Sequence, residues 1–282
     1  MRIVRCLVVV SVLALALPAR AHHEAIFGPQ SSLVFSSPGF LSMQLFSRKL
    51  GSGDASRQET TALVSAGFSP FDGVPLSFTV IAPASHVAGP GTEARTGPED
   101  LVVGTRYRFD LTGLQRRWDK DGNFLLGMAA AELPVGNIDH ASFHGPLGGM
   151  FAGLGSVERG SFSAIGYGFY KLHGSYENAK KGDNLFLGGG VAWTPWDEPG
   201  GRLFSVQLGW SHESYFKDSV AGVTDERTGG TAMLVHPTLV LGPGGNLLLF
   251  ALCSIPVWQS YANPANEDRW RVGGGVTWLF GH

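Results

Sequence analysis

The stretch "LVVGTRYRFDL", Leu101 to Leu111, has two unlike faces if it forms an extended strand. Successive side chains of a strand point to opposite sides. One face then carries Leu101, Val103, Thr105, Tyr107 and Phe109, and the other carries Val102, Gly104, Arg106, Arg108 and Asp110. A soluble sheet would turn the apolar face toward a core, whereas a membrane barrel would turn it toward lipid and keep the charges in a wet interior. The rest of the chain has to decide between the two.

The chain opens with the features of a secretory signal peptide. Arg2 and Arg5 precede the apolar run Cys6 to Leu17, and Ala19-Arg20-Ala21 is a small-x-small cleavage site, so we expect removal of residues 1–21. The remaining 261 residues carry 18 basic and 23 acidic side chains, a net charge of about −5, which argues against a nucleic-acid partner. Cys253 is then the only cysteine, which excludes a disulfide framework and a cysteine-based metal site.

Period-2 alternation, bounded by clusters of Gly, Pro, Asn and Asp, predicts twelve strands after the signal. No apolar run there approaches the roughly 18 residues of a membrane-spanning helix. The predicted strands are Gly39–Arg48, Thr60–Phe68, Leu76–Ala84, Asp100–Leu111, Asn123–Pro134, Gly149–Val157, Ser161–Leu172, Asn184–Pro195, Arg202–Tyr215, Gly230–Leu241, Asn246–Trp258 and Asp268–Phe280.

The connections between these strands alternate in length. Long polar segments such as "SHVAGPGTEARTGPE" and "FKDSVAGVTDERTG" alternate with short links such as "VERG" and "GPGG", with "TGLQRRWDKDG" as an exception. Outer-membrane barrels have short periplasmic turns and long extracellular loops, while a soluble sandwich or propeller has no reason to alternate. The predicted fold is therefore all-β: one antiparallel transmembrane β-barrel of about twelve strands over residues 39–282. Residues 22–38 are expected to form a periplasmic segment that could plug the lumen.

Tryptophans and prolines refine this prediction. Trp193, Trp196 and Trp278 are expected near the periplasmic strand ends and Trp210, Trp258 and Trp270 near the outer ends, as in the aromatic belts of membrane proteins. Pro237 interrupts the run "MLVHPTLVL", and because proline cannot donate a ladder hydrogen bond, we expect a bulge or break there, with Pro256 raising the same expectation.

The inward face of such a barrel supplies the candidate site residues. The same alternation turns Ser211 and Thr238 inward, and charged groups inside a barrel can either line a permeation path or close the lumen as a salt-bridge plug. Both interpretations stay open, because a twelve-stranded barrel is narrow enough for side chains to fill. The lumen-lining candidates are Arg106, Arg108, Asp110, Glu132, Gln207, Glu213, His236 and Arg271.

Three other motifs carry weaker chemistry. His22 and His23 at the new N-terminus could bind Cu²⁺ or Zn²⁺, although a disordered polar terminus is the commoner explanation. His140-Ala141-Ser142 is similar to the His-x-Ser pair of outer-membrane phospholipases, but the Asn-Gly expected after the serine is missing. "DKDGN", Asp119 to Asn123, lacks the sixth-position glycine of a calcium loop and is better explained as a turn. We therefore expect no enzymatic activity and no cofactor.

Short motifs resemble an outer-membrane transporter family of the phenol-degradation, meta-pathway-like type. They are the His-His start after the signal, "DLVVGTRYRF", "AAAELPVGN", "GGGVAWTP" and the closing "WRVGGGVTWLF". The resemblance covers most of the mature chain and implies passage of small, often aromatic or apolar compounds. One departure is that Phe280 is followed by Gly281-His282, whereas such barrels usually end on an aromatic residue that the barrel assembly machinery reads.

Together these features predict a channel or transporter in a Gram-negative outer membrane, in which a small solute passes through a polar lumen selected by its width and charges. The expected partners are membrane lipid, the solute and the assembly machinery. A lipid-modifying barrel enzyme, a structural or metal-binding surface barrel and a soluble periplasmic all-β protein are the alternatives.

Overall fold

The computed structural model describes residues 39–53, 56–71, 74–90, 92–110, 123–136, 147–176, 178–198 and 202–280. Over these ranges the chain is built from β-strands, with one short 3₁₀ turn, η2, at Pro264–Asn266. None of the described residues forms a helix with the length and apolar character needed to cross a membrane.

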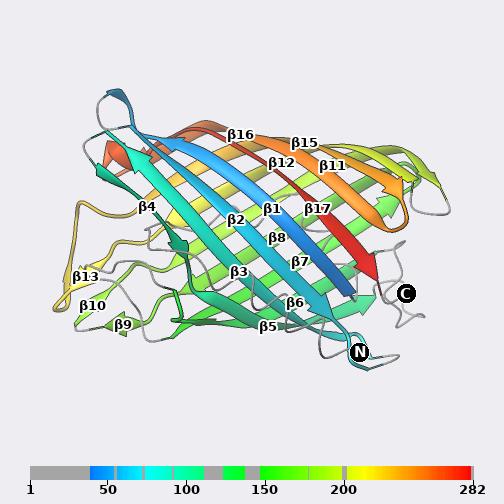
Figure 1. Ribbon diagram of the computed structural model, residues 1–282, viewed down its shortest axis with the longest axis horizontal. Helices are drawn as coiled ribbons and strands as arrows, with labels where there is room; N and C mark the ends of the chain where they lie inside the picture. Colours follow the sequence, from blue (N-terminus) through cyan, green and yellow to red (C-terminus); the bar gives the residue numbers. More distant parts are fainter. Residues whose placement is uncertain are drawn as a thin grey trace.

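Twelve strands form the wall of a closed antiparallel barrel (Figure 1). Each pairs with its neighbours along the chain, β1 pairs with β17, and the β2–β3 pairing completes the ring, which confirms the predicted fold class. The wall strands are β1 (Gly39–Leu50), β2 (Arg57–Phe68), β3 (Leu76–Gly89), β5 (Leu101–Asp110), β6 (Phe124–Leu133), β7 (Gly148–Arg159), β8 (Phe162–Leu172), β11 (Asn184–Glu198), β12 (Arg202–Tyr215), β15 (Gly230–Gly244), β16 (Leu247–Tyr261) and β17 (Asp268–Phe280).

Five further strands extend one end of the barrel and were not predicted. The first, β4 (Thr92–Pro98), pairs with residues 84–89 of β3. The others belong to the connections β8–β11 and β12–β15, which pair with each other as a four-stranded sheet in the order β14-β13-β10-β9. They are β9 (Ser175–Tyr176), β10 (Ala179–Lys180), β13 (Ser219–Val220) and β14 (Val223–Thr224).

The two ends of the barrel differ as the alternating connections predict. Gly39 opposes Phe280, so the first and last strands meet at one end, which we call the turn end. The connections 160–161 and 245–246 lie at this end. The opposite end, the loop end, carries β9, β10 and β13 in Figure 1. The exceptional connection "TGLQRRWDKDG" lies entirely outside the described residues.

The strand Leu101–Asp110 turns its apolar face outward and its arginines inward. Phe109 is 54% exposed on the outer surface, whereas Arg106 is fully buried inside the barrel. Leu41, Leu208 and Ile255 show that other strands also expose apolar side chains outward. The outer surface also carries all six tryptophans of the predicted belts: Trp193, Trp196, Trp210, Trp258, Trp270 and Trp278. Apolar side chains therefore cover the outer surface of this wall.

The expected break at Pro237 is present. The ladder between β15 and β16 passes from the pair Val235–Ile255 to the pair Thr238–Leu252 without pairing Pro237. At Pro256 the register shifts by one residue, because Val257 bulges out of β16. The missing N–H of Pro237 accounts for the unpaired rung, and the bulge at Val257 directly follows Pro256.

Candidate functional site

The barrel interior is the candidate site, and its turn-end part holds two of the predicted arginines. Arg106 and Arg108 on β5 are buried. Each guanidinium lies over an aromatic ring from another strand, Arg106 at 4.9 Å from the centre of the Phe40 ring and Arg108 at 4.4 Å from that of Phe124. Such cation–π contacts stabilise a desolvated charge. Asp110 ends the same strand, where its backbone pairs with Phe124.

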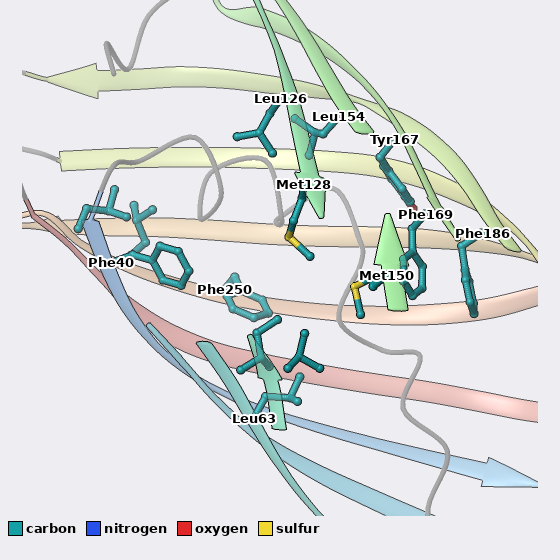
Figure 2. Close-up of a cluster of buried hydrophobic side chains, with 14 of the residues drawn as sticks. Phe40, Leu63, Leu126, Met128, Met150, Leu154, Tyr167, Phe169, Phe186 and Phe250 are labelled. Carbon is teal, nitrogen blue, oxygen red and sulfur yellow. The ribbon is translucent and has the colours of Figure 1, made fainter. Parts of the chain in front are cut away.

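Much of the inner surface is apolar, which differs from the polar lumen expected from the sequence. Inward side chains from most of the wall strands pack into one buried group, which we call the apolar cluster (Figure 2). Within it, the rings of Phe169 and Phe186 stack at 5.0 Å. Its members are Phe40, Phe46, Leu63, Ile81, Val102, Phe124, Leu126, Met128, Met150, Leu154, Tyr167, Phe169, Phe186, Val240, Leu248, Phe250 and Leu279.

Toward the loop end the interior becomes charged. Arg271 makes two hydrogen bonds to Glu213, at 2.8 and 2.7 Å, and two to Asp268, at 2.9 and 2.6 Å. Bidentate arginine–carboxylate pairs of this kind fix geometry as well as charge. The adjoining strands β1 and β2 add Glu59, which accepts from Arg48 at 2.8 Å and from Arg57 at 2.9 Å. These six residues, three cations and three anions, are the ionic cluster.

His236 connects this region to the Pro237 break. Its Nδ1 lies 2.7 Å from the Ser254 hydroxyl on β16, and its Nε2 lies 2.8 Å from the Ser211 hydroxyl on β12. The imidazole therefore joins three strands where a backbone rung is missing. Thr238 and Gln207 are buried nearby on the same inner face.

A separate ion pair crosses the other side of the barrel. Lys171 Nζ on β8 donates to Glu132 Oε1 on β6 at 2.7 Å, and both side chains are largely buried. Glu132 is thus not brought together with Glu213 and Arg271. Its partner Lys171 lies at the end of a predicted strand but was not among the sequence candidates.

Six of the eight sequence candidates therefore fall into three groups. Glu213, Arg271 and His236 lie in or beside the ionic cluster, Arg106 and Arg108 lie among apolar rings, and Glu132 lies apart. Their part in solute passage stays a prediction. His22, His23, His140, Ser142 and the residues Asp119 to Gly122 lie outside the described part of the chain.

Two acidic partners were missed. Asp268 is buried beside Arg271 although the two are three residues apart, a spacing that strict alternation places on opposite faces. The β1–β17 register skips Arg269, and this bulge turns Asp268 inward. Glu59 was missed because β2 begins three residues earlier than predicted. Extending the alternation of Thr61, Leu63 and Ser65 backward by one step would have found it.

No group of three or more His, Cys, Asp or Glu side chains within the described ranges is arranged to hold a metal ion. The carboxylates of the ionic cluster are occupied by arginines instead.

Comparisons with known proteins agree on the fold. The COG4313 outer membrane channel from Pseudomonas putida F1 is similar with a TM-score of 0.69 and 9% identity, over 86% of this chain and 96% of that one. The β domain of the Bordetella autotransporter BrkA is similar with a TM-score of 0.52 and 13% identity, over 86% and 100%. No protein-family model and no curated protein matches the chain, so the resemblance to the phenol-degradation family stays a prediction. At these identities, the similarity shows a shared β-barrel fold.

Proposed function

We propose that the protein is an outer-membrane channel for small apolar or aromatic solutes. The observation that carries this proposal is the apolar cluster, because an inner surface made of Phe, Leu and Met side chains attracts apolar molecules and offers little to hydrated ions. The charges toward the loop end are balanced and paired within the ionic cluster, so they do not create a field that would draw ions of one sign.

The outer surface supports a membrane location. Exposed apolar side chains such as Leu45, Phe151 and Leu208 lie on separate strands, and six tryptophans accompany them. A contiguous apolar surface of this kind is unfavourable in water and suits lipid. Every wall strand pairs with a neighbour on each side, so the sheet has no free edge strand. Along most of the wall this pairs the backbone groups that a bilayer would penalise by several kcal/mol each when left unpaired. The printed name of one similar structure, an outer membrane channel, agrees with this role.

Uptake of an apolar fluorescent amine, N-phenyl-1-naphthylamine, by intact Gram-negative cells tests the proposal. Cells that express the protein should take up the probe faster than cells with an empty vector. Leu126→Gln places an amide inside the apolar cluster and should slow uptake, whereas Leu125→Gln changes the neighbouring residue, which is 47% exposed on the outer surface, and should leave uptake unchanged. Equal uptake with and without the protein would contradict the proposal.

A further inference from the structure

The seam between β16 and β17 is held differently from the rest of the wall. Ladder pairing runs from Leu247–Trp278 to Ser254–Arg271 and stops there, although β16 continues to Tyr261 and β17 begins at Asp268. The three rungs that would follow, 255 with 270, 256 with 269 and 257 with 268, are missing among these described residues.

Pro256 explains where the ladder stops. Backbone groups of successive residues point alternately to the two neighbouring strands. The Leu279 N–H donates to the Asn246 carbonyl at 2.9 Å, so the even-numbered residues that follow in β16 direct their N–H groups toward β17. Pro256 falls on this series and has no N–H to donate. The bulge at Val257 then keeps the upper part of β16 in register with β15 rather than with β17.

The Gln259 side chain bridges the unpaired part of the seam. The Gln259 Nε2 donates to the Asp268 carbonyl at 2.8 Å, and the Asp268 N–H donates to the Gln259 Oε1 at 2.9 Å. The amide of Gln259 thus takes the place of a backbone rung. On its other side, toward β15, this part of β16 also lacks regular pairing near Pro237. There the His236–Ser254 hydrogen bond joins the two strands.

The seam is apolar on its outer side and charged on its inner side at the missing rungs. Outside, Ile255, Val257, Trp258 and Trp270 are exposed. Inside, Asp268 and Arg271 of the ionic cluster lie beside the missing rungs, and Phe250 and Leu252 lie further along β16 toward the turn end, in or against the apolar cluster. A movement of β16 away from β17 would therefore open a path from the apolar outer surface past Asp268 and Arg271 to the apolar cluster.

We propose that the barrel wall opens sideways between residues 255–257 of β16 and residues 268–270 of β17, and that apolar solutes pass there between the surrounding lipid and the apolar cluster. The Gln259 amide is the clasp that closes this side opening. The inference rests on the proposed function for its solute, but the opening itself is a property of the wall.

A disulfide across the seam tests the proposal. Ile255→Cys with Trp270→Cys, in a Cys253→Ser background, places two cysteines at the first missing rung. A disulfide between them needs the strands to approach within about 7 Å between Cα atoms. Leu249→Cys with Val276→Cys is the matched control, because this outward-facing pair belongs to the regular part of the same seam. Heat-modifiable migration in gels confirms that each variant is folded.

Uptake of N-phenyl-1-naphthylamine is then measured with oxidised and with reduced protein. The oxidised 255–270 variant should fall to the rate of cells without the protein and recover on reduction, while the oxidised control should match its reduced form. Gln259→Leu, which removes the clasp, should raise the rate. Wild-type uptake through the oxidised 255–270 variant would overturn the side opening and leave the proposed function standing.

Hydrogen exchange in detergent tests the opening without a solute. The Asp268 amide, whose N–H is held across the seam by the Gln259 side chain, should exchange at least about tenfold faster than the seam-facing amides of Leu248, Phe250 and Leu252, because local openings expose it. Exchange as slow as in the regular ladder would overturn the side opening. If the wild-type protein transports no probe but the Asp268 amide exchanges quickly, the proposed solute is wrong and the mobile seam remains.

Discussion

At the scale of single residues, Arg271 is the central group of the ionic cluster, on which the burial of two carboxylates depends. Arg271 satisfies two carboxylates at once, and Glu213 also accepts a hydrogen bond from the Tyr215 hydroxyl at 2.7 Å. Charges that are removed from water are tolerated when they are paired and hydrogen-bonded. The cluster is therefore stable as a unit and sensitive to the loss of its central guanidinium.

Arg271→Leu should lower the free energy of unfolding by about 3–5 kcal/mol, because it leaves Glu213 and Asp268 buried without a cation. Urea unfolding in detergent, followed by heat-modifiable migration, measures the change. Arg227→Leu is the control, since the Arg227–Asp225 pair is solvent-screened at the surface and its loss should leave stability essentially unchanged. A comparable loss of unfolding free energy in both variants would show that the buried ionic cluster contributes no more to stability than a surface ion pair.

His173 makes one loop sensitive to acid. Burial and then the charges of Lys181 and Lys171 lower the pKa of His173 from 6.5 to about 2, against the opposing effect of the Gly182 backbone, which favours the charged ring. The backbone N–H of His173 donates to Asp183 at 3.0 Å, which ties together the two ends of the β8–β11 connection. Protonation of the buried imidazole is therefore unfavourable in the folded β8–β11 connection.

The pH dependence follows from that lowered pKa. The unfolded imidazole takes up a proton below about pH 6.5 and the folded one does not, so stability is full above that pH and falls by about 1.4 kcal/mol for each unit below it. Limited proteolysis of the β8–β11 connection should therefore be faster at about pH 5.5 than at about pH 7.5. His173→Phe should lose this difference, and an unchanged pH response in that variant would contradict the assignment.

How far residues could be predicted depended on local regularity. Arg106 and Arg108 were placed correctly on the inner face because β5 alternates without interruption. Asp268 was missed because a bulge reverses its face, and a bulge leaves no mark in the pattern of residue types. The ionic cluster, which joins β1, β2, β12 and β17, needs the closed order of the strands before its members can be recognised as neighbours.

At the scale of elements, prolines mark the irregularities of the wall. Pro83 lies where β3 changes partner from β5 to β4, and Pro195 lies in the register shift between β11 and β12. Pro237 and Pro243 of β15 and Pro256 of β16 lie at the three irregularities of the β15–β16 ladder. Of these, the irregularities at Pro237 and Pro256 were predicted from the sequence, because a missing donor is a local property. The short strands of the loop end could not be predicted, since two-residue pairings carry no periodic signal.

Glycines shape the inner surface by making room for rings on neighbouring strands. Gly188 opposes Tyr167, and Gly273 opposes Phe46; a Cβ at either glycine would collide with the ring of its partner. Covering a glycine with a cross-strand aromatic ring protects its backbone and fixes the rotamer of the ring. Part of the glycine content of this chain therefore serves the packing of the apolar cluster.

Gly188→Ala should lower the free energy of unfolding by about 1–3 kcal/mol, because the Tyr167 ring must leave its position in the apolar cluster. Gly127→Ala on β6 is the matched control, since a Cβ there meets nothing within 4 Å, and its effect should stay within about 0.5 kcal/mol. Urea midpoints of the two variants decide the matter. Equal midpoints would mean that the ring moves without cost.

At the scale of the whole molecule, the sequence predicted the barrel better than its interior. Alternating connection lengths and outward tryptophans follow from closure and from an apolar surrounding, so they are visible along the chain. The content of the interior is not, because β6, "FLLGMAAAEL", is largely apolar on both faces. Only the paired strands show that Leu126 and Met128 join Met150 and Phe169 in one cluster rather than facing a polar lumen.

The ionic cluster should also set the axial conductance of the barrel. Its side chains reach across the loop end from β1, β2, β12 and β17, and they are charge-balanced, so we expect wild-type protein in a planar bilayer to pass little ionic current. A triple variant, Arg271→Ser, Glu213→Ser and Asp268→Ser, removes both charge and volume and should raise the single-channel current. The matched variant Arg271→Met, Glu213→Gln and Asp268→Asn removes charge but keeps volume, and it should stay as silent as the wild type. Equal currents from the two variants would place the constriction elsewhere along the barrel, and a wild-type current as large as that of the serine variant would mean that these side chains do not close the path.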